Sequence, residues 1–408
     1  MVKTGIVPAK IMLPAVSDMT AWACVACDQF TSEPEYWTQL EKQVSGKPSA
    51  LSLVLPEIYL GSGQGEKIAA INRNMENYLA GGIFRTLPEG FILTVRSTPY
   101  VKRRIGLVGA VDLEEYDYAK NSSALVRATE GTIEERIPPR LEIRKNAPME
   151  FSHIMVLFDD EKREITERLY EERNRFEKLY DFDLNMNGGH IEGYFIPADT
   201  GVQQRFSALL DEERLIKKYG KADKFAFAVG DGNHSLATAK AHWNRIKEGL
   251  PQSERANHPA RYALAEFVNI YDEGIYFEPI YRLVTGVNAR DFAEGLKKAQ
   301  GCFEILLYGD KIKVSGGGDL PASISAADGY IEKYIRAHGG AVDYIHGEEN
   351  LAALIKGGTA AGVIFEKLDK SKLFKYVSDH GALPRKTFSM GEGVEKRYYL
   401  EGRRITND

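Results

Sequence analysis

The segment FAFAVGDGNHSLATAKAHW, residues 225–243, restricts the fold of the chain more than any other part of the sequence. Its first five residues are all apolar, which predicts a strand that is buried on both faces. Gly230 and Gly232 follow, and glycine readily adopts the backbone angles that a tight turn requires. From Leu236 onward, apolar residues recur at helical spacing. The segment therefore predicts a buried strand, a sharp turn and the N-terminus of a helix in immediate succession.

Polar groups gather at this predicted turn in a pattern that suits an anion. The first backbone N–H groups of a helix have no partner within the helix, and with the helix dipole they attract a phosphate or a carboxylate. Asn233, His234 and Ser235 add side-chain donors at the same point. Asp231 adds a carboxylate that could bind a metal ion or take a proton. A structural alternative is that Asp231 or Asn233 caps the helix while His234 bonds a nearby carbonyl.

The composition narrows the class of protein. The chain has 408 residues, of which 43% are hydrophobic and 27% charged, as in globular proteins of two or three domains. A net charge of -5 argues against a protein that coats nucleic acid, because phosphate binding needs a basic face. The sequence has no run of 18 apolar residues, so we expect no membrane span. Three cysteines in a chain of this length are typical of the reducing cytoplasm.

Strand-like and helix-like segments alternate along the chain, which predicts a mixed α/β protein of the α+β class. We expect a main domain over residues 1–290 and a smaller C-terminal α/β unit over residues 291–408, whose last segment returns to the main domain. The expected strands include residues 22–26, 90–95, 103–111, 151–158 and 262–271. Ser32 and Glu35 form a capping box that predicts a helix start, and residues 161–179 have the pattern of a charged helix.

Two carboxylates after the first of these strands are candidates for a general base. Asp28 follows the strand expected at residues 22–26, and ligands commonly bind beyond the carboxyl ends of strands in α/β sheets. Glu33 lies shortly after it. Either carboxylate could take a proton from a substrate hydroxyl. The structural alternative is that Asp28 caps its turn and that Glu33 favours the dipole of the next helix.

The turn Asp231-Gly232-Asn233-His234-Ser235 resembles the Asp-Gly-His-His-Arg turn of the ParB/sulfiredoxin superfamily. In that superfamily a strand, this turn and a helix N-terminus bind nucleotide phosphates, and its members include partition proteins, sulfiredoxins and free-serine kinases. The chain as a whole resembles the domain-of-unknown-function family 1015 (DUF1015). The segments that carry this resemblance are ACVACDQFTSEPEYW, RATEGTIEERIPPRLEIR, FAVGDGNHSLATAKAHW, IYFEPIYRLV and LPRKTFSMGEGVEKRYYLEGR. The resemblance implies a ParB/sulfiredoxin-like core in the main domain.

The sequence departs from the pattern of these relatives at two positions. Ser235 stands where many relatives have an arginine that clamps a phosphate, and Tyr281 stands where relatives often have a histidine before Arg282. Another cation must therefore reach the turn. The candidates are Arg282, Arg385 and Lys386. We favour Arg385 and Lys386, because a short basic segment next to a proline is easily directed toward a phosphate. The planar guanidinium of arginine also matches the geometry of phosphate oxygens.

The resemblance implies a nucleotide-dependent phosphotransferase that acts on a small metabolite, in the manner of a free-serine kinase. The phosphates of ATP or ADP would be held by Gly230, Gly232, Asn233, His234 and Ser235, with the cation described above. Asp231 would hold Mg²⁺, and Asp28 or Glu33 would be the catalytic base, with Asp231 and His234 as further catalytic residues. The substrate would be serine or a phosphorylated metabolite.

Two other functions fit the same residues. One is a non-catalytic nucleotide-sensing or nucleic-acid-binding module, which needs a basic face or a helix-turn-helix. The other is a metal-dependent hydrolase, which needs Asp28, His190, Asp231 and His234 to converge. We expect a cytoplasmic protein with a small-molecule partner and with neither a nucleic-acid nor a membrane partner. The sequence leaves the formation of a homo-oligomer open.

Overall fold

The computed structural model describes residues 3–61, 63–132 and 134–407, and the chain divides into two compact units. Unit 1 comprises Met1–Ile275 and Glu392–Asp408, and unit 2 comprises Tyr276–Gly391. Unit 2 is therefore inserted into the chain of unit 1. Both units contain helices and a sheet, which confirms the predicted mixed α/β class; the large sheet of unit 1 is mixed, and the described strand pairs of unit 2 are antiparallel. In the described part of the chain, every helix is too short or too polar to cross a membrane.

The strands of unit 1 form one large mixed sheet and one short pair. They are β1 (Ile6–Val7), β2 (Ala9–Pro14), β3 (Cys24–Val25), β4 (Phe84–Ser97), β5 (Arg104–Asp112), β6 (Tyr116–Asp117), β7 (Val126–Ala128), β8 (Met149–Phe151), β9 (Met155–Phe158), β10 (Lys178–Leu184), β11 (Gly189–Pro197), β12 (Phe227–Asp231), β13 (Tyr262–Asn269), β20 (Tyr398–Tyr399) and β21 (Gly402–Arg404). Among the described residues the large sheet has 13 strands, in the order β6-β7-β12-β9-β13-β5-β4-β2-β21-β8, with β1, β10 and β11 joined beside this path. The remaining two strands, β3 and β20, pair with each other.

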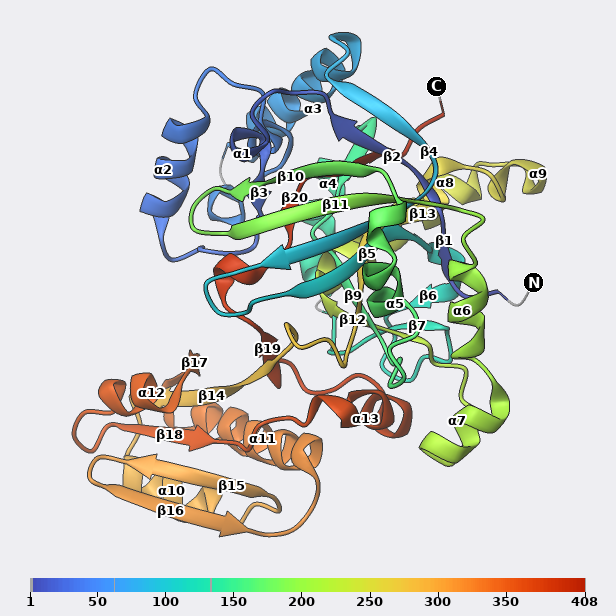
Figure 1. The fold of residues 1–408 in the computed structure, drawn as a ribbon. Coiled ribbons are helices and arrows are strands. Elements are labelled where there is room, and N and C mark those ends of the chain that lie inside the picture. The colour runs from blue at the N-terminus through green and yellow to red at the C-terminus, as the bar shows by residue number, and fades with distance from the viewer. Residues whose placement is uncertain (1–2, 62, 133, 408) are drawn as a thin grey trace. The chain divides into compact units, whose positions relative to one another are not determined.

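Helices cover both faces of the large sheet (Figure 1). Those of unit 1 are α1 (Met19–Trp22), α2 (Pro34–Val44), α3 (Gln64–Ala80), α4 (Ile137–Arg144), α5 (Thr166–Glu171), α6 (Val202–Ala208), α7 (Glu212–Tyr219), α8 (Asn233–Glu248) and α9 (Gln252–Arg255). Neighbouring residues of a strand point to opposite faces, so Leu107 and Val108 of β5 enter different cores. The core around Val108 includes Trp37 of α2, and the core around Leu107 includes Trp243 of α8.

The central prediction of a strand, a turn and a helix is confirmed at β12 and α8. Gly230 falls at an irregularity in the pairing of β12 with β9, where a bulge lets the strand end turn. Gly232 has φ 76°, in the left-handed region, and precedes the helix. A Cβ atom there would lie 3.0 Å from the Cα of Ile154, so the turn requires glycine for two reasons. No side chain caps the start of α8.

Several local predictions are wrong. The strand expected at residues 22–26 is reduced to β3, because Trp22 ends the short helix α1. The cap expected at Ser32 is absent, since α2 begins at Pro34 after Glu33 and has no side-chain cap. The helix expected at residues 161–179 is only α5, and the chain then enters β10, which pairs with β11. The strand expected at residues 151–158 is interrupted between β8 and β9.

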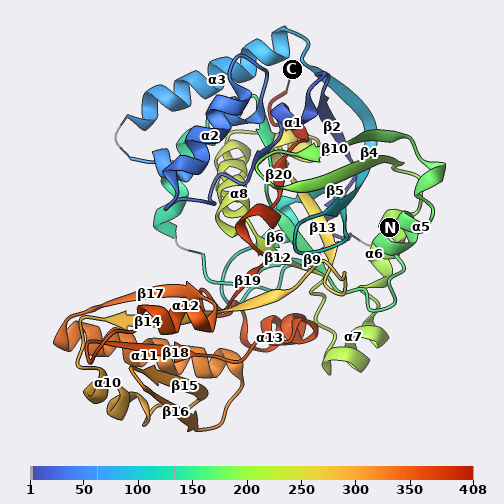
Figure 2. The same ribbon diagram turned by 60° about the vertical axis from the view of Figure 1, so that its left-hand side comes forward.

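The C-terminal segment of unit 1 rejoins the large sheet, because β21 pairs with both β2 and β8. Figures 1 and 2 show the red strand β20 among the elements of unit 1. Arg96, which is only 2% exposed, holds the start of this segment. Its guanidinium donates to the carbonyls of Val394, Glu395 and Lys396. A buried cation therefore fixes the backbone next to Lys396.

Unit 2 is a smaller α/β unit. Its elements are β14 (Phe277–Thr285), α10 (Ala289–Leu296), β15 (Cys302–Leu307), β16 (Asp310–Ser315), α11 (Leu320–His338), β17 (Ala341–His346), α12 (Glu348–Leu354), β18 (Ala360–Ile364), α13 (Leu373–His380) and β19 (Phe388–Met390). Its strands follow the order β16-β15-β18-β14-β17, and β19 pairs with β14. On one face of β14, Leu283 packs with Leu351 of α12; on the other, Arg282 pairs with Asp328 of α11. The sequence placed the start of this unit at residue 291, whereas unit 2 spans Tyr276–Gly391.

Candidate functional site

Four segments of unit 1 that are far apart in the sequence meet at the start of α8. We call this group the turn cluster. It consists of Cys27, Asp28, His153, Asp231, Ser235, Lys396 and Tyr399, which are linked by hydrogen bonds and ion pairs. The first two follow β3, His153 lies in the interruption between β8 and β9, and the last two come from the returning C-terminal segment. The cluster therefore depends on the tertiary fold rather than on one motif.

His153 is the centre of the turn cluster and is only 6% exposed. Its Nδ1 atom lies 2.6 Å from the hydroxyl oxygen of Tyr399. Its Nε2 atom lies 3.3 Å from the Oγ atom of Ser235 and 3.7 Å from a carboxylate oxygen of Asp28. In a Ser-His-Asp triad the serine and the carboxylate contact opposite ring nitrogens. Here both approach Nε2, and a tyrosine takes the place at Nδ1.

Tyr399 connects His153 to Cys27. Its hydroxyl donates to the Sγ atom of Cys27 at 3.0 Å and accepts from the backbone N–H of Cys27 at 3.3 Å. Burial raises the pKa of the Cys27 thiol to about 12, and the nearby charge of Asp28 contributes in the same direction. Burial also raises the pKa of Tyr399. Both groups therefore keep their protons at neutral pH, and Cys27 is not a thiolate nucleophile.

Asp28 remains ionised although it is largely enclosed. Burial alone would raise its pKa, but the charge that His153 carries in its protonated form, a hydrogen bond from Gln29 and the charge of Lys396 outweigh this effect and lower the pKa below its ordinary value. The Gln29 side chain donates to Asp28 at 2.9 Å. Asp28 is thus a fixed carboxylate close to Nε2 of His153. Glu33, the other predicted base, is exposed and precedes α2.

Lys396 forms an ion pair with the turn through Asp231. Its Nζ atom lies 3.2 Å from Asp231, and its side chain is 9% exposed. The second carboxylate oxygen of Asp231 accepts from the backbone N–H of Gly232 at 2.9 Å. The lysine ammonium is therefore held beside the first residues of α8, where the sequence lacks the arginine that relatives carry.

The three cations that the sequence suggested all lie in unit 2. Arg282 is fully buried, and its guanidinium pairs with Asp328 at 2.8 Å. It also donates to the backbone carbonyls of Arg385 and Lys386. Arg282 thus holds the Arg385-Lys386 segment through its backbone.

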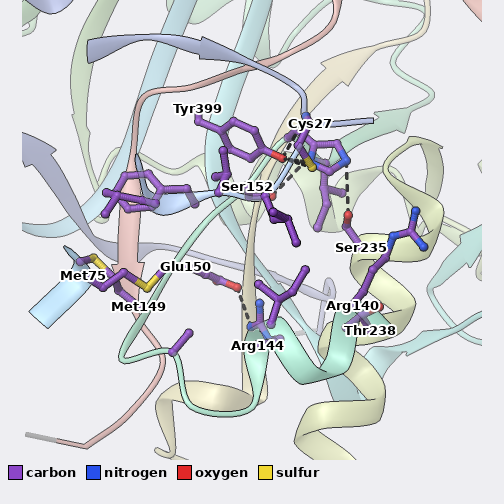
Figure 3. A pocket seen from close by; sticks show the side chains of 18 of the residues that line it. Cys27, Met75, Arg140, Arg144, Met149, Glu150, Ser152, Ser235, Thr238 and Tyr399 are labelled. Atoms are coloured by element: carbon purple, nitrogen blue, oxygen red, sulfur yellow. Dashed lines mark hydrogen bonds and ion pairs between the residues drawn. The ribbon is translucent and has the colours of Figure 1, made fainter. Parts of the chain in front are cut away.

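A cavity of about 140 Å³ lies beside the turn cluster (Figure 3). Cys27, His153, Ser235 and Tyr399 form its polar end. The apolar wall is formed by Leu53, Val54, Leu55, Leu60, Met75, Ile143, Ala147 and Met149. Figure 3 shows Met75 and Met149 on the side of the cavity away from Ser235. Two arginines of α4 complete the lining; Arg140 pairs with Glu57, and Arg144 pairs with Glu150 at 2.6 Å.

The first residues of α8 carry the other predicted ligands. Asn233 is 6% exposed, and its Oδ1 atom is buried with no hydrogen-bond partner in the described part of the protein. Buried polar side-chain atoms normally have a partner, so this amide indicates a group that the protein itself does not supply. His234 is partly buried, and its carbonyl accepts from the hydroxyl of Thr238 at 2.7 Å.

The hydrolase hypothesis required His190 to join Asp28, Asp231 and His234. Instead, His190 lies on β11 and pairs with two aspartates of β10, at 2.9 Å and 2.7 Å. In the described ranges, the one group of three metal-ligating residues with ligand atoms within 4.8 Å of one another is Asp181, His190 and Glu192. Lys178 already pairs with both carboxylates of that group, at 2.6 Å and 3.2 Å. The carboxylates near the turn therefore do not form a site with His190.

Sequence reasoning missed four members of the turn cluster, namely Cys27, His153, Lys396 and Tyr399. His153 was hidden within an apolar run that looked like one strand, although the adjacent polar pair Ser152-His153 signalled the interruption. Lys396 and Tyr399 lie in EKRYYLEG, which was interpreted only as a returning strand. No short-range pattern links that segment to the turn at Gly232.

Comparison with known proteins gives one family. The model of the family described as "Protein of unknown function (DUF1015)" matches residues 6–387. No curated protein matches the chain. The similar solved structures include a conserved hypothetical protein from Pyrococcus furiosus, with 10% identity, a TM-score of 0.35 and coverage of 73% of this chain and 94% of that one. SbnI with a C-terminal truncation from Staphylococcus aureus has 9% identity and a TM-score of 0.35. The match covers 70% of this chain and 82% of the SbnI chain. A free serine kinase in complex with AMP has 10% identity and a TM-score of 0.37. The match covers 73% of this chain and 90% of the kinase chain.

Proposed function

Because this chain belongs to the DUF1015 family, whose description assigns no activity, we propose a function from the turn cluster: the protein is a nucleotide-dependent phosphotransferase that acts on a small metabolite. The observation that carries this proposal is the start of α8. No side-chain hydrogen bond caps this helix start in the described structure, and the ammonium group of Lys396, paired with Asp231, lies beside it. A helix N-terminus and a lysine together make a site for phosphate. The strand, turn and helix around Gly232 would then act as the phosphate-binding turn of the ParB/sulfiredoxin superfamily does.

The phosphates of ATP or ADP would bind at the first residues of α8. Gly232 lets the turn before these residues pack against Ile154, because a side chain there would collide with it. Lys396 supplies the positive charge that Ser235 does not. Oδ1 of Asn233, which has no partner among the described residues, would accept a hydrogen bond from a hydroxyl of the bound nucleotide or acceptor, because phosphate oxygens do not donate. These groups act chiefly by position and charge, which is the main task of a protein in phosphoryl transfer.

The nucleobase would occupy the adjacent cavity. Its wall is apolar, and its volume of about 140 Å³ is close to that of a cavity that admits one benzene-sized ring. A flat aromatic base fits such a wall better than a charged group does. The polar end of the cavity, at His153 and Ser235, faces the start of α8. A nucleotide can therefore place its base and its phosphates in neighbouring parts of one site.

Asp28 is the proposed base for the acceptor hydroxyl. It is ionised and lies within the turn cluster, whereas Glu33 is exposed. Kinases use an aspartate in this role, because it orients the attacking hydroxyl and accepts its proton. The acceptor would be a small hydroxyl compound such as serine.

Mg²⁺ fits this site through Asp231. A carboxylate is the oxygen ligand that Mg²⁺ prefers, and one or two carboxylates together with substrate phosphates suffice to hold the ion. Asp231 now pairs with Lys396 at 3.2 Å, so it already lies next to the proposed phosphate position. When bound, the ion would neutralise part of the phosphate charge.

Thermal-shift and calorimetric titrations with ATP and ADP, each with and without Mg²⁺, test this function. We expect the melting temperature to rise with nucleotide, and Lys396→Met to weaken binding at least tenfold. The matched control is Lys386→Met, a lysine of unit 2 whose loss should leave the affinity unchanged. Failure of every nucleotide to stabilise the wild-type protein would overturn the proposal. An effect of Lys386→Met equal to that of Lys396→Met would instead support the cation suggested by the sequence.

A further inference from the structure

Three serine and threonine hydroxyls line the cavity, and Ser235 alone among them contacts an imidazole in the described structure. Thr238 donates its hydroxyl to the carbonyl of His234, one helical turn earlier, at 2.7 Å. The Ser152 hydroxyl accepts from the backbone N–H of Ile154 at 3.1 Å. Ser235 instead lies 3.3 Å from Nε2 of His153, and Figure 3 shows this contact at the edge of the cavity. Its environment is therefore that of a hydroxyl that can be deprotonated.

The hydrogen bonds of Tyr399 determine which nitrogen of His153 carries the proton. The tyrosine has one hydroxyl proton, and it donates that proton to Sγ of Cys27. Its oxygen must then accept from Nδ1 of His153, which lies 2.6 Å away. With the proton on Nδ1, the neutral imidazole has a lone pair on Nε2, directed at Ser235. This is the tautomer in which a histidine acts as a base toward a serine.

Asp28 completes the arrangement. Its carboxylate lies 3.7 Å from Nε2 of His153, on the same side of the ring as Ser235. It cannot hydrogen-bond to Nε2 while that atom carries only a lone pair. Once the serine proton arrives there, the carboxylate faces an imidazolium and stabilises its charge. Gln29 holds Asp28 from the other side at 2.9 Å.

From these contacts we infer that Ser235 is a nucleophile and that phosphoryl transfer passes through a phosphoserine at this residue. The inference rests on the proposed function. Ser235 stands at the start of α8, where the phosphates are proposed to bind, so its Oγ atom is next to the phosphorus that must be transferred. No other hydroxyl that lines the described cavity has both this position and a base.

The two steps balance as follows. In the first, Oγ of Ser235 forms a bond to the terminal phosphorus of the nucleoside triphosphate, the bridging P–O bond breaks, and the serine proton passes to Nε2 of His153. The nucleoside diphosphate leaves. In the second, the acceptor hydroxyl attacks the phosphoserine and gives its proton to Asp28, while the departing Oγ recovers its proton from His153. The released proton passes from Asp28 to water, and no oxidant or reductant is needed.

The experiment is to mix the full chain with Mg²⁺ and ATP radiolabelled in its γ-phosphate, without acceptor, and to quench in acid. We expect an acid-stable label of up to about one phosphate per chain, located at Ser235 by peptide mapping. Ser235→Ala should abolish it, and His153→Gln should slow labelling by about 10²-fold or more. Ser207→Ala in α6 is the control and should keep the label, because its hydroxyl donates to the carbonyl of Gln203 and does not line the described cavity.

The outcomes separate this inference from the proposed function. If ATP stabilises the protein but leaves no label at Ser235, and Ser235→Ala still transfers phosphate, the intermediate is disproved while the function stands. A label that is lost in acid, as phosphohistidine is, would also disprove it. If ATP neither binds nor is consumed, the proposed function itself fails. If His153→Gln does not fold, the comparison of Ser235→Ala with Ser207→Ala still decides the question.

Discussion

The hydroxyl oxygen of Tyr399 lies 2.6 Å from Nδ1 of His153, across 246 positions of the sequence. The two rings are nearly perpendicular, with an interplanar angle of 85°. This contact joins the returning C-terminal segment to the interruption between β8 and β9. It also sets the orientation of the imidazole at the start of α8, and it is the natural first target for mutation.

Tyr399→Phe should destabilise the protein by about 1–3 kcal/mol, because Nδ1 of His153 and the backbone N–H of Cys27 lose a buried partner while the ring shape is kept. The free energy of unfolding in urea measures this. Labelling of Ser235 should become slower, and its pH profile should shift, since the imidazole is no longer held in one tautomer. A variant with unchanged stability and an unchanged pH profile would show that the ring of Tyr399 packs against its neighbours and that its hydroxyl does not control His153.

Asp28→Asn should lower the rate of phosphoryl transfer by about 10²–10⁴-fold and change nucleotide affinity little, because the carboxylate acts on the acceptor proton. Steady-state kinetics and calorimetry measure the two quantities separately. Glu33→Gln is the matched control, since Glu33 is exposed and precedes α2. Equal rate losses in both variants would contradict the assignment of Asp28.

Gly232→Ala should destabilise the protein by about 2 kcal/mol or more. The residue has φ 76°, where a side chain alone costs about 1–2 kcal/mol, and the new methyl would press on the Cα of Ile154 at 3.0 Å. Nucleotide binding should weaken as well, because the turn must shift. Gly65→Ala in α3 is the control: nothing lies within 4 Å of the added atom, so stability should be unchanged or slightly higher. Chemical denaturation gives the free energy of unfolding of both variants. An equal loss in Gly232→Ala and Gly65→Ala would contradict this account of the turn.

His242 should make the fold sensitive to acid. Burial, and then the positive charge of Arg144, lower its pKa from 6.5 to about 4. The unfolded chain therefore binds a proton at a higher pH than the folded protein does, so stability is full above about pH 6.5 and is lost as the pH falls toward 4. The loss amounts to about 3 kcal/mol. His242→Gln should remove this part of the acid dependence, as urea titrations at several pH values can measure.

His190 provides a control of opposite sign for that experiment. Hydrogen bonds that the protonated imidazole donates to Asp183 and Asp181 raise its pKa, so its contribution to stability is present at low pH and is lost as the pH rises through the folded pKa. His190→Gln should therefore lower stability at acid pH, where His242→Gln preserves it. Because His190 is partly exposed, its effect should be the smaller one. Identical pH profiles for the two variants would contradict both assignments.

The backbone of the site could be predicted from the sequence because its signals are short-range. An apolar run, two glycines and helical spacing lie within twenty residues and produce β12, the turn and α8. The helix expected at residues 161–179 shows where such signals fail. Charged residues at helical spacing were outweighed by the pairing of β10 with β11, since non-local strand contacts override local propensity.

The partners of the turn could not be predicted, because they depend on which distant segments the fold brings together. Ser235 signalled that a cation was missing, but nothing in the sequence tells Lys396 from Lys386. The difference is made by buried contacts such as those of Arg96, whose guanidinium holds the backbone of Lys396. One segment that carries the family resemblance, LPRKTFSMGEGVEKRYYLEGR, contains both lysines and does not rank them.

Because unit 2 interrupts unit 1, the ribosome makes the last members of the turn cluster only after the whole of unit 2. A nascent chain that stops before Glu392 already contains Asp28, His153 and Ser235, yet it has neither Lys396 nor Tyr399. A product that terminates before Lys396 and Tyr399 would thus be inactive rather than partly active. Translation itself would delay assembly of the site until unit 2 has been synthesised, so that under the proposed function a chain still lacking Lys396 and Tyr399 would not consume nucleotide.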